Sequence, residues 1–434
     1  MYRKYIKTVK KSTKETAQKI MKGMKNDFFE ESDLPGLHQM LGERLSQLSL
    51  DIGACLTRMF LEREIEYLCG PKNGRDTQRK YYRHGQQLGY AYLAGQRVPV
   101  ERLRVQMKQG GEVELESYKR MQDKGCFNQD VMRRLLLGVS SRNYDEVIEH
   151  ASERCGVSKS AVSASFTMAT KLEIDKIVKR DLSQEHWVVV YMDGNDIAGE
   201  TMIAALGITI TGEKRVLGLR QGGTENKEVA SELIKDIRDR GLRYEEGILF
   251  VTDGSKALKA AIKENFGEYA SIQRCRVHKR RNVLAHVPKN QQTWVGKQID
   301  NAYKEKDTDK ARKELQSIAE NLEKINPDAA GSMREGLEET LTILKFGLPD
   351  ILTKTLMSTN PIESIFSMTE NVIGRVKRWR GNDMRRRWLC AALMYAEKRC
   401  NRIRGYLHLS QLSEALKKNL TGVEKSIDKV EKAA

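Results

Sequence analysis

The sequence lacks any apolar run close to the roughly 18 residues that a helix needs to cross a bilayer. Its first 25 residues are rich in Lys and Thr and have no apolar centre, which is not typical of a secretory signal. The seven cysteines form no Cys-x-x-Cys pair, so they fit free thiols in a reducing compartment better than a disulfide framework. We therefore expect a cytoplasmic protein without a membrane partner.

Aromatic residues are also scarce, at 6% of the chain, whereas positive charge is in excess. Lys and Arg number 76 against 59 Asp and Glu, which gives a net charge of +17. An excess of this size indicates a polyanionic partner, most often nucleic acid. The alternative is that the charge serves solubility alone. The length of 434 residues allows two or three domains, each with a core of its own.

Two apolar runs each end in an Asp-Gly step. The first runs from Trp187 to Met192 and leads into Asp193; the second precedes Asp253. Continuous apolar runs that are bounded by turn signals predict strands buried on both faces. Two such strands that deliver their carboxylates to one sheet edge suit a divalent metal, because hard cations prefer oxygen ligands on rigid supports.

A third carboxylate, Glu363, follows Thr359-Asn360-Pro361 at the start of another predicted helix. Three carboxylates suffice to hold the two cations that in-line phosphoryl transfer uses. Each of the three also has a purely structural interpretation. These interpretations are a turn at Asp193, a helix cap at Asp253 and a capping box at Glu363.

The order of the predicted elements indicates an α/β multidomain protein. Residues 186–285 alternate strands and helices, and predict a mixed sheet of antiparallel and parallel strands with helices on its faces. We expect these regions: an N-terminal helical region (1–74), a basic DNA-contacting subdomain (75–127), a helix-turn-helix-like domain (128–182), the first part of a catalytic core (183–278), an all-helical insertion (279–355), the last part of the core with a basic helix (356–420) and a flexible tail (421–434).

Three stretches are candidates for DNA contact. Residues 75–110 interleave basic residues with tyrosines, although a small β-rich subdomain with a solvated face is the alternative. Tyr144 to Cys155, the break at Gly156 and the Ser-rich start of the next helix resemble a helix-turn-helix, or else an ordinary helical corner. The third, within 375–387, is otherwise a solvated helix. The predicted DNA-contacting residues of the first two stretches are Arg79, Lys80, Arg83, Arg102, Arg104, Ser158, Lys159 and Ser160, and those of the third are Arg375, Lys377, Arg378 and Trp379.

The order of these motifs resembles that of the Mutator-type transposases of bacterial insertion sequences. It consists of Asp193-Gly, Thr-Asp253-Gly, Cys275-x-x-His278, a helical insertion and Thr-Asn-x-x-Glu363, over about residues 75–405. The resemblance implies an RNase H-like fold and an Asp-Asp-Glu triad that binds two Mg²⁺ or Mn²⁺ ions. It also implies that Cys275 and His278 support the active-site strand and helix. The acidic Asp196 and Glu200 depart from the pattern and compete as ligands.

The implied substrates are double-stranded DNAs, namely the terminal inverted repeats of an element and a target, in a nucleoid-associated protein. Hydrolysis at the element's end would be followed by strand transfer, and a homodimer is expected because two ends are joined together. The predicted DNA contacts near the site are Arg276, Lys279, Arg280 and Arg281. Two alternatives stay open: a structure-specific RNase H-like nuclease without strand transfer, and a non-catalytic helix-turn-helix regulator.

Overall fold

The computed structural model describes residues 53, 55–74, 79–93, 96–139, 159–197, 200–222, 227–376 and 378–431. Its contacts divide the chain into two compact units, Met1–Val131 with Val139–Ser165, and Met132–Gly138 with Phe166–Ala434. No helix in the described ranges combines the length and the apolar character that crossing a membrane demands. The two units are described in turn.

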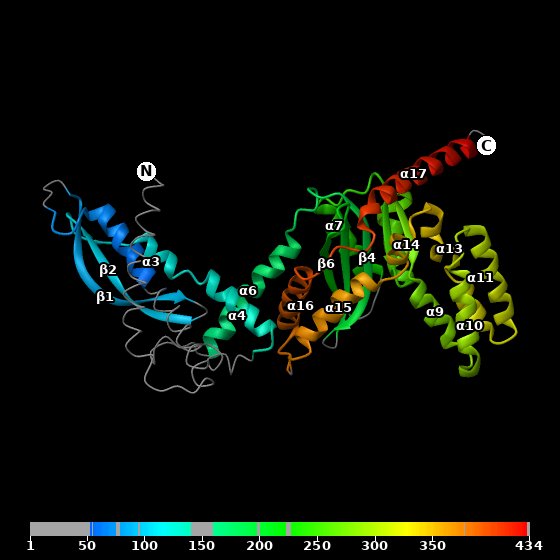
Figure 1. Cartoon of the computed structure of the whole chain (residues 1–434), viewed down its shortest axis with the longest axis horizontal. Helices are drawn as coiled ribbons and strands as arrows, with labels where there is room; N and C mark the ends of the chain where they lie inside the picture. Colours follow the sequence, from blue (N-terminus) through cyan, green and yellow to red (C-terminus); the bar gives the residue numbers. More distant parts are fainter. Residues whose placement is uncertain are drawn as a thin grey trace, which may run out of the picture. The chain divides into compact units, whose positions relative to one another are not determined.

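The first unit is built around a small antiparallel sheet with the strand order β1-β2-β3 (Figure 1). A helix over residues 55–69 packs on this sheet through Leu61 and Ile65, which contact apolar side chains of the strands. The β-rich architecture therefore agrees with the alternative considered for residues 75–110. The elements are β1 (Tyr81–Leu93), β2 (Gln96–Met107), β3 (Glu112–Val113), α3 (Glu116–Met121) and the start of α4 (Gly125–Leu136).

The second unit contains a five-stranded mixed sheet in the order β6-β5-β4-β7-β8. The pairs β4–β5 and β5–β6 are antiparallel, whereas β4–β7 and β7–β8 are parallel. This confirms the predicted mixed sheet, including the position of the crossover between β6 and β7. The strands are β4 (Trp187–Ile197), β5 (Glu200–Thr209), β6 (Lys214–Gly222), β7 (Ile248–Thr252) and β8 (Ala270–Arg274).

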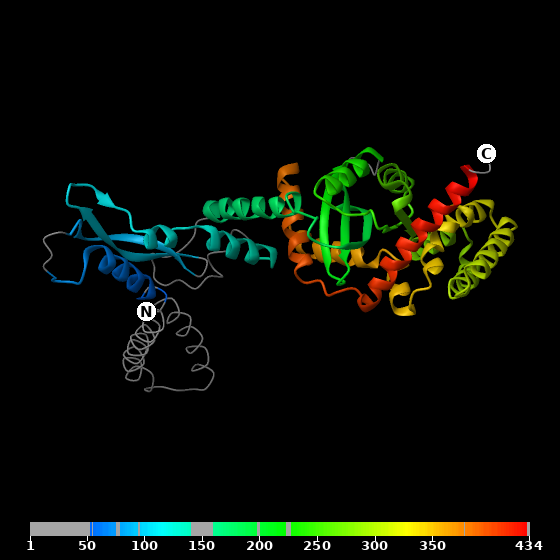
Figure 2. The ribbon, with the colours of Figure 1, turned by 90° about the horizontal axis from the view of Figure 1, so that it is seen from above.

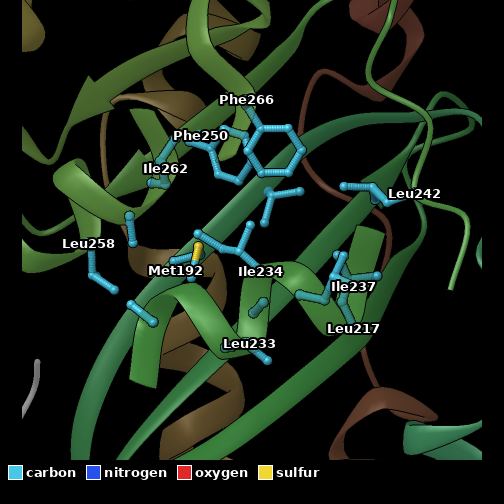
Figure 3. Packing of buried hydrophobic residues seen from close by; sticks show 14 of the residues in the cluster. Met192, Leu217, Leu233, Ile234, Ile237, Leu242, Phe250, Leu258, Ile262 and Phe266 are labelled. Carbon is cyan, nitrogen blue, oxygen red and sulfur yellow. The ribbon is translucent and has the colours of Figure 1, made fainter. Parts of the chain in front are cut away.

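Helices cover both faces of this sheet. Figure 2 shows the strands between the pair α7 (Lys227–Asp239) and α8 (Lys256–Phe266) and the pair α15 (Asn360–Ile373) and α16 (Asn382–Glu397). Alternating strand residues face α7 and α8, so that the sheet and these helices bury one continuous apolar core. Figure 3 shows this core, in which Met192 and Phe250 of the central strands meet side chains of α7 and α8.

The region between β8 and α15 is helical and has a core of its own. Its apolar residues recur at helical spacing and form a cluster separate from that of the sheet. Helices run through the segment for which the sequence predicted an all-helical insertion, 279–355, and the first of them begins at Arg276. The elements are η1 (Gly267–Tyr269, before β8), α9 (Arg276–Ala285), α10 (Lys289–Ala302), α11 (Thr308–Glu323), α12 (Pro327–Arg334), α13 (Leu337–Thr340), η2 (Thr342–Phe346) and α14 (Asp350–Leu356).

Two further predictions concern the segments that flank the sheet. Most of the proposed helix-turn-helix, up to Ser158, lies outside the described residues, and Lys159 and Ser160 open the long helix α6 (Lys159–Val178). After η3 (Tyr406–His408), helix α17 (Leu409–Glu431) continues through most of the stretch expected to be a flexible tail. Its Lys- and Glu-rich sequence has a high helix propensity, which explains this difference.

Candidate functional site

Asp193 and Asp253 follow directly after two residues that pair across the centre of the sheet. Met192 of β4 is paired with Thr252 of β7 in parallel register, so the two aspartates lie at the same level of the sheet. The strand predicted to end before Asp193 continues to Ile197, so Asp193 lies within β4, whereas Asp253 follows the end of β7. Asp193 is 6% exposed, and one of its oxygens accepts a hydrogen bond from the backbone N–H of Gly194. The parallel pairing thus brings together two acidic residues that are 60 positions apart in the sequence.

Asp253 also shapes the turn that leaves β7. Its Oδ1 accepts a 2.9 Å hydrogen bond from the backbone N–H of Ser255, and Ser255 itself caps α8. The helix cap predicted for Asp253 is therefore supplied by Ser255. Gly254 has a φ of +108°, and a Cβ atom there would collide with the Arg274 side chain, which explains why glycine follows this aspartate.

Glu363 lies in the first turn of α15, which packs against β4. Its Oε1 accepts a 2.8 Å hydrogen bond from the hydroxyl of Thr359 and lies 3.6 Å from Nε2 of His278. A capping box requires a glutamate at the third helical position that binds the backbone N–H of the cap residue. The N-cap residue is Thr359 and not Asn360, so Glu363 lies at the fourth position, and the Thr359 N–H points to Cys275 Sγ at 3.4 Å. The capping-box interpretation of Glu363 is therefore wrong.

Cys275 and His278 surround the same threonine. His278 Nδ1 lies 3.3 Å from the Thr359 hydroxyl, and Cys275 Sγ lies 3.5 Å from it. The backbone N–H of Cys275 donates a 2.7 Å hydrogen bond to the carbonyl of Thr252, which precedes Asp253. Cys275 therefore connects the end of the Asp253 strand to the start of the Glu363 helix.

The ionisation of this pair reflects these contacts. Burial would raise the pKa of the Cys275 thiol, but hydrogen bonds with His278 and Thr359 outweigh it and lower that pKa. The pKa of His278 is raised, first by its hydrogen bond with Cys275 and then by the charges of Cys275, Glu363 and Asp193, against the effect of burial. His278 therefore lies within the electrostatic reach of two of the three acidic residues.

The donor set suits a hard cation, although the carboxylates are not closed around one. Asp193 within β4, Asp253 just after the end of the adjacent β7 and Glu363 on a packed helix offer oxygen atoms, which match the ligand preference of Mg²⁺ and Mn²⁺. Within the described part of the chain, no three His, Cys, Asp or Glu side chains lie close enough together to hold a metal ion. In this conformation Glu363 is turned toward Thr359 and His278.

The two competing acidic residues are placed differently. Successive residues of a strand point to opposite faces, and Asn195 contacts Glu370 on the α15 side of the sheet. Asp193 shares this face, whereas Asp196 belongs to the other, where it accepts a 2.7 Å hydrogen bond from the Thr201 hydroxyl. Glu200 is the first residue of β5, and its side chain is not among those that the structure describes. The strand register therefore favours Asp193 over Asp196.

Two of the basic residues near the site are internal. Arg276 is buried and donates to the carbonyls of Thr340 and Tyr303 at 2.9 Å. Lys279 is fully buried and donates to the carbonyls of Ser332 and Glu335, where α12 ends. The prediction that Arg276 and Lys279 contact DNA is corrected, because both side chains brace the helical region from inside.

The remaining basic residues of this segment are nearer the surface. Arg280 donates a 2.8 Å hydrogen bond to Asp300, and Arg281 is exposed. Sequence spacing alone did not separate the internal from the exposed members of this run, because all four lie within the first six residues of α9. In a run of basic residues on a helix, some side chains are buried where the end of another helix offers carbonyl groups that lack a partner.

The basic residues of the first unit are partly engaged within it. Arg102 and Arg104 of β2 both bind the carboxylate of Glu112 on β3, at 2.8 and 2.7 Å. Arg79 and Arg83 donate to the carbonyls of Gly74 and Gly70, and Lys80 is exposed at the start of the sheet. The arginine forks are thus held in fixed positions, with part of their donor capacity used by the protein.

The third predicted DNA-contacting stretch joins α15 to α16. Arg375 donates to the carbonyl of Leu137, Arg378 is exposed, and Trp379 is half-buried. Lys377 lies outside the described residues. Farther along, Trp388 stacks on Phe166 of α6 with ring centroids 4.4 Å apart, so this tryptophan belongs to the packing of the unit.

Thr359 is the site residue whose role the sequence did not reveal. It is fully buried and contacts Glu363, His278 and Cys275. A signal was present, because Thr359 and Glu363 are four residues apart, the spacing at which side chains meet along a helix. The link to Cys275, 84 positions away, required the fold.

Comparisons with known proteins find related sequences over most of the chain. Residues 57–381 match the family model for Transposase, Mutator family. The chain is 28% identical over 319 residues to the transposase for insertion sequence element ISRM5 of Rhizobium meliloti (strain 1021), which covers 70% of this chain and 76% of that protein.

Two further relatives have similar names. One is the transposase for insertion sequence element IS256 in transposon Tn4001 of Staphylococcus aureus, 25% identical over 69% of this chain and 77% of that protein. The other is the transposase for insertion sequence element IS1081 of Mycobacterium tuberculosis (strain ATCC 25618 / H37Rv), 24% identical over 77% of this chain and 82% of that protein. Because the family model spans most of the sequence, the chain belongs to the Mutator family of transposases.

Proposed function

We propose that this transposase cleaves and joins DNA through an Asp-Asp-Glu triad formed by Asp193, Asp253 and Glu363. The observation that supports this most directly is the parallel pairing of β4 with β7, which sets both aspartates at one level beside the helix of Glu363. We interpret the strand order β6-β5-β4-β7-β8 with helices on both faces as an RNase H-like domain. In this interpretation the acidic sheet is catalytic, and the helical insertion interrupts the domain between β8 and α15.

The three carboxylates would hold divalent cations, Mg²⁺ or Mn²⁺, in a two-ion arrangement. When bound, such cations polarise the phosphate and lower the pKa of the attacking oxygen. The protein's own residues position the carboxylates. The pairing of β4 with β7 fixes the two aspartates, and Thr359 and His278 orient the glutamate at the start of α15.

The DNA substrates would be the terminal inverted repeats of an insertion sequence and a target duplex. Hydrolysis at the end of the element would free a 3′-hydroxyl. This hydroxyl would then attack a phosphodiester of the target, form a new phosphodiester bond and release a 3′-hydroxyl of the cut target strand. Residues 75–175 would bind the terminal repeat, and a homodimer would hold the two ends together. The net charge of +17 supports an association dominated by phosphate contacts.

The test is the cleavage of a labelled terminal-repeat duplex in Mg²⁺ by the purified Glu363→Gln variant. Glutamine keeps an acceptor for the Thr359 hydroxyl but removes the charge, so we expect cleavage to fall to background while DNA binding persists. Glu370→Gln is the matched control, because Glu370 lies two turns along α15 and also contacts β4, through Asn195. Cleavage by Glu363→Gln at the normal rate would refute the triad.

A second experiment examines the joining step. A duplex with a labelled 3′-hydroxyl end is supplied together with unlabelled target DNA and Mg²⁺. A joined product longer than either substrate is expected of a transposase. Cleavage without any joined product would instead support a nuclease, and binding without cleavage in any divalent metal would support a regulator.

A further inference from the structure

The second unit contains a hollow of about 770 Å³ beside the start of α15. It is bounded by α14, by the first residues of α15, by the start of β6 and by residues 401–404. Four cationic side chains line it, namely Lys214, Lys354, Arg402 and Arg404. None of the four belongs to the basic stretches for which the sequence predicted DNA contact.

The hollow is held in shape by the fold. The backbone N–H of the buried Ile403 donates a 3.0 Å hydrogen bond to the carbonyl of Gly212 in the turn between β5 and β6. On the opposite side, the Thr355 hydroxyl of α14 donates a 3.1 Å hydrogen bond to the Arg404 carbonyl. Residues 401–404 are therefore fixed to the sheet and to α14, so the positions of the two arginines are set by packed elements.

The positive charge in this hollow is not neutralised by the protein. Over the ranges that the structure describes, none of the four cationic side chains takes part in an ion pair, in contrast to Arg180 or Arg312, which bind carboxylates. The acidic residue of the lining is Asp350, and it lies 3.4 Å from Lys306. Arg402 is exposed, and its guanidinium lies over the ring of Tyr406, 5.2 Å from the ring centroid. Unpaired cations in a concave surface concentrate positive potential and attract anions.

Neutral hydrogen-bonding groups accompany the four charges. Ser358, Asn360, Ser364 and Asn401 line the same hollow. Hydroxyl and amide side chains combined with Lys and Arg are the groups that contact phosphate oxygens in protein–DNA complexes. The lining therefore suits a chain of phosphates, whose oxygens accept hydrogen bonds from both kinds of side chain.

We propose that this hollow, the α14–α15 groove, binds the phosphodiester backbone of DNA. Asn360 and Ser364 face the groove from α15, and Glu363 lies between them in sequence on the same turn of the helix. A strand that occupies the groove would therefore run next to the residue assigned to the triad. The proposal rests on the proposed function for its substrate class, and it adds a backbone contact on the catalytic unit itself.

The test measures DNA binding without catalysis. The full-length Lys214→Gln/Lys354→Gln variant is titrated into a fluorescently labelled duplex in EDTA at several NaCl concentrations, with anisotropy as the readout. Each lost phosphate contact reduces the slope of log K against log salt by about 1, so we expect a reduction of about 2. Affinity for an unrelated duplex should fall by the same factor, since phosphate contacts carry no sequence information.

The matched control is Lys297→Gln/Lys324→Gln, which removes two exposed lysines from the helical insertion of the same unit. Its salt slope should equal that of the wild type. Arg402→Gln/Arg404→Gln provides an independent pair from the other side of the groove and should lower the slope similarly. Unchanged slopes in both groove variants, or an equal change in the control, would overturn the proposal. Because no metal is present, the result does not depend on whether the triad assignment holds.

Discussion

The Thr359 hydroxyl donates its hydrogen bond to the Glu363 carboxylate at 2.8 Å, one helical turn away on α15. A hydroxyl has one proton to donate, so the orientation of Glu363 depends on where Thr359 is held. Thr359 is held in turn by Cys275, whose backbone binds the strand of Asp253. Two of the three proposed metal ligands are thus coupled through a single buried threonine.

Thr359→Val should therefore slow DNA cleavage and raise the Mn²⁺ concentration that half-maximal cleavage requires. Loss of a hydrogen bond to a charged group costs about 1.5–3 kcal/mol, which corresponds to a reduction of roughly 10- to 100-fold. Thr359→Ser restores the hydroxyl and should recover most of the rate. Thr369→Val is a suitable control on the same helix, because the buried Thr369 hydroxyl has no hydrogen-bond partner within the described structure. Equal rates for Thr359→Val and Thr369→Val would disprove this role.

Lys279 should make the stability of the helical insertion depend on pH. Burial lowers the pKa of Lys279 to about 7, from an ordinary value of about 10.4. Between these values the unfolded chain binds a proton that the folded chain lacks, so the folded state loses stability as the pH falls from about 10 to 7. The measurement is the apparent melting temperature of the wild type and of Lys279→Met over this range.

The variant provides the comparison. At pH 10, Lys279→Met should be the less stable protein, because it leaves the carbonyls of Ser332 and Glu335 without their donor, at a cost of about 1–3 kcal/mol. Toward pH 7 the difference should narrow, since methionine has no charge to bury. A difference between the two proteins that stays constant with pH would show that Lys279 keeps its ordinary pKa.

Glu397 should be among the most sensitive polar positions of the second unit. Its carboxylate accepts two hydrogen bonds from Arg180, at 2.8 and 2.9 Å, and one from the backbone N–H of Val216 at 2.6 Å. Removing one partner of a buried pair leaves a charge uncompensated, so Glu397→Gln should lower the free energy of unfolding by about 3–5 kcal/mol. Urea denaturation measures this change.

The exposed pair of Arg334 with Glu323 supplies the contrast, because both side chains are about half exposed. Glu323→Gln should change the free energy of unfolding by no more than about 1 kcal/mol. If Glu397→Gln and Glu323→Gln lower the free energy of unfolding by the same amount, the bonds of Glu397 to Arg180 and to Val216 of β6 do not contribute the stability that we infer.

The start of α6 offers a test of the helix-turn-helix prediction. Ser158→Glu and Lys159→Glu should weaken binding to the terminal-repeat duplex, since each places negative charge where the motif would meet DNA. Lys171→Glu, at an exposed position farther along α6, is the control for net charge. Anisotropy titrations are the measurement, and equal losses in all three variants would attribute the effect to charge alone.

The sequence predicted the five-stranded sheet well and the surroundings of its carboxylates poorly. The apolar runs before Asp193 and Asp253 fixed two strands, because few alternatives bury so many consecutive apolar residues. The capping motifs and the runs of charged residues predicted less about the site, because the bonds of these side chains are made to residues far away in the sequence. Thr359 uses its N–H for Cys275, and Lys279 satisfies the end of α12, contacts that no local spacing encodes.

Arg276 illustrates the same limit. Its place in a basic run predicted an exposed side chain, yet its guanidinium lies over the Tyr303 ring and binds backbone carbonyls. The sequence does not distinguish an arginine that binds groups inside the protein from one that is free to bind a phosphate. The four cations of the α14–α15 groove show the converse, because they are dispersed along the chain and gather only in the folded unit.

The helical insertion leaves and rejoins the sheet domain through almost the same point. The N–H of Arg276, where the insertion begins, donates a 2.9 Å hydrogen bond to the carbonyl of Met357, where it ends. The insertion has a core of its own, and its later part is also bonded to β8 through Thr340, Thr342 and Ile343. The distance in space between the second and third acidic residues is therefore set by these contacts and not by the number of residues between them.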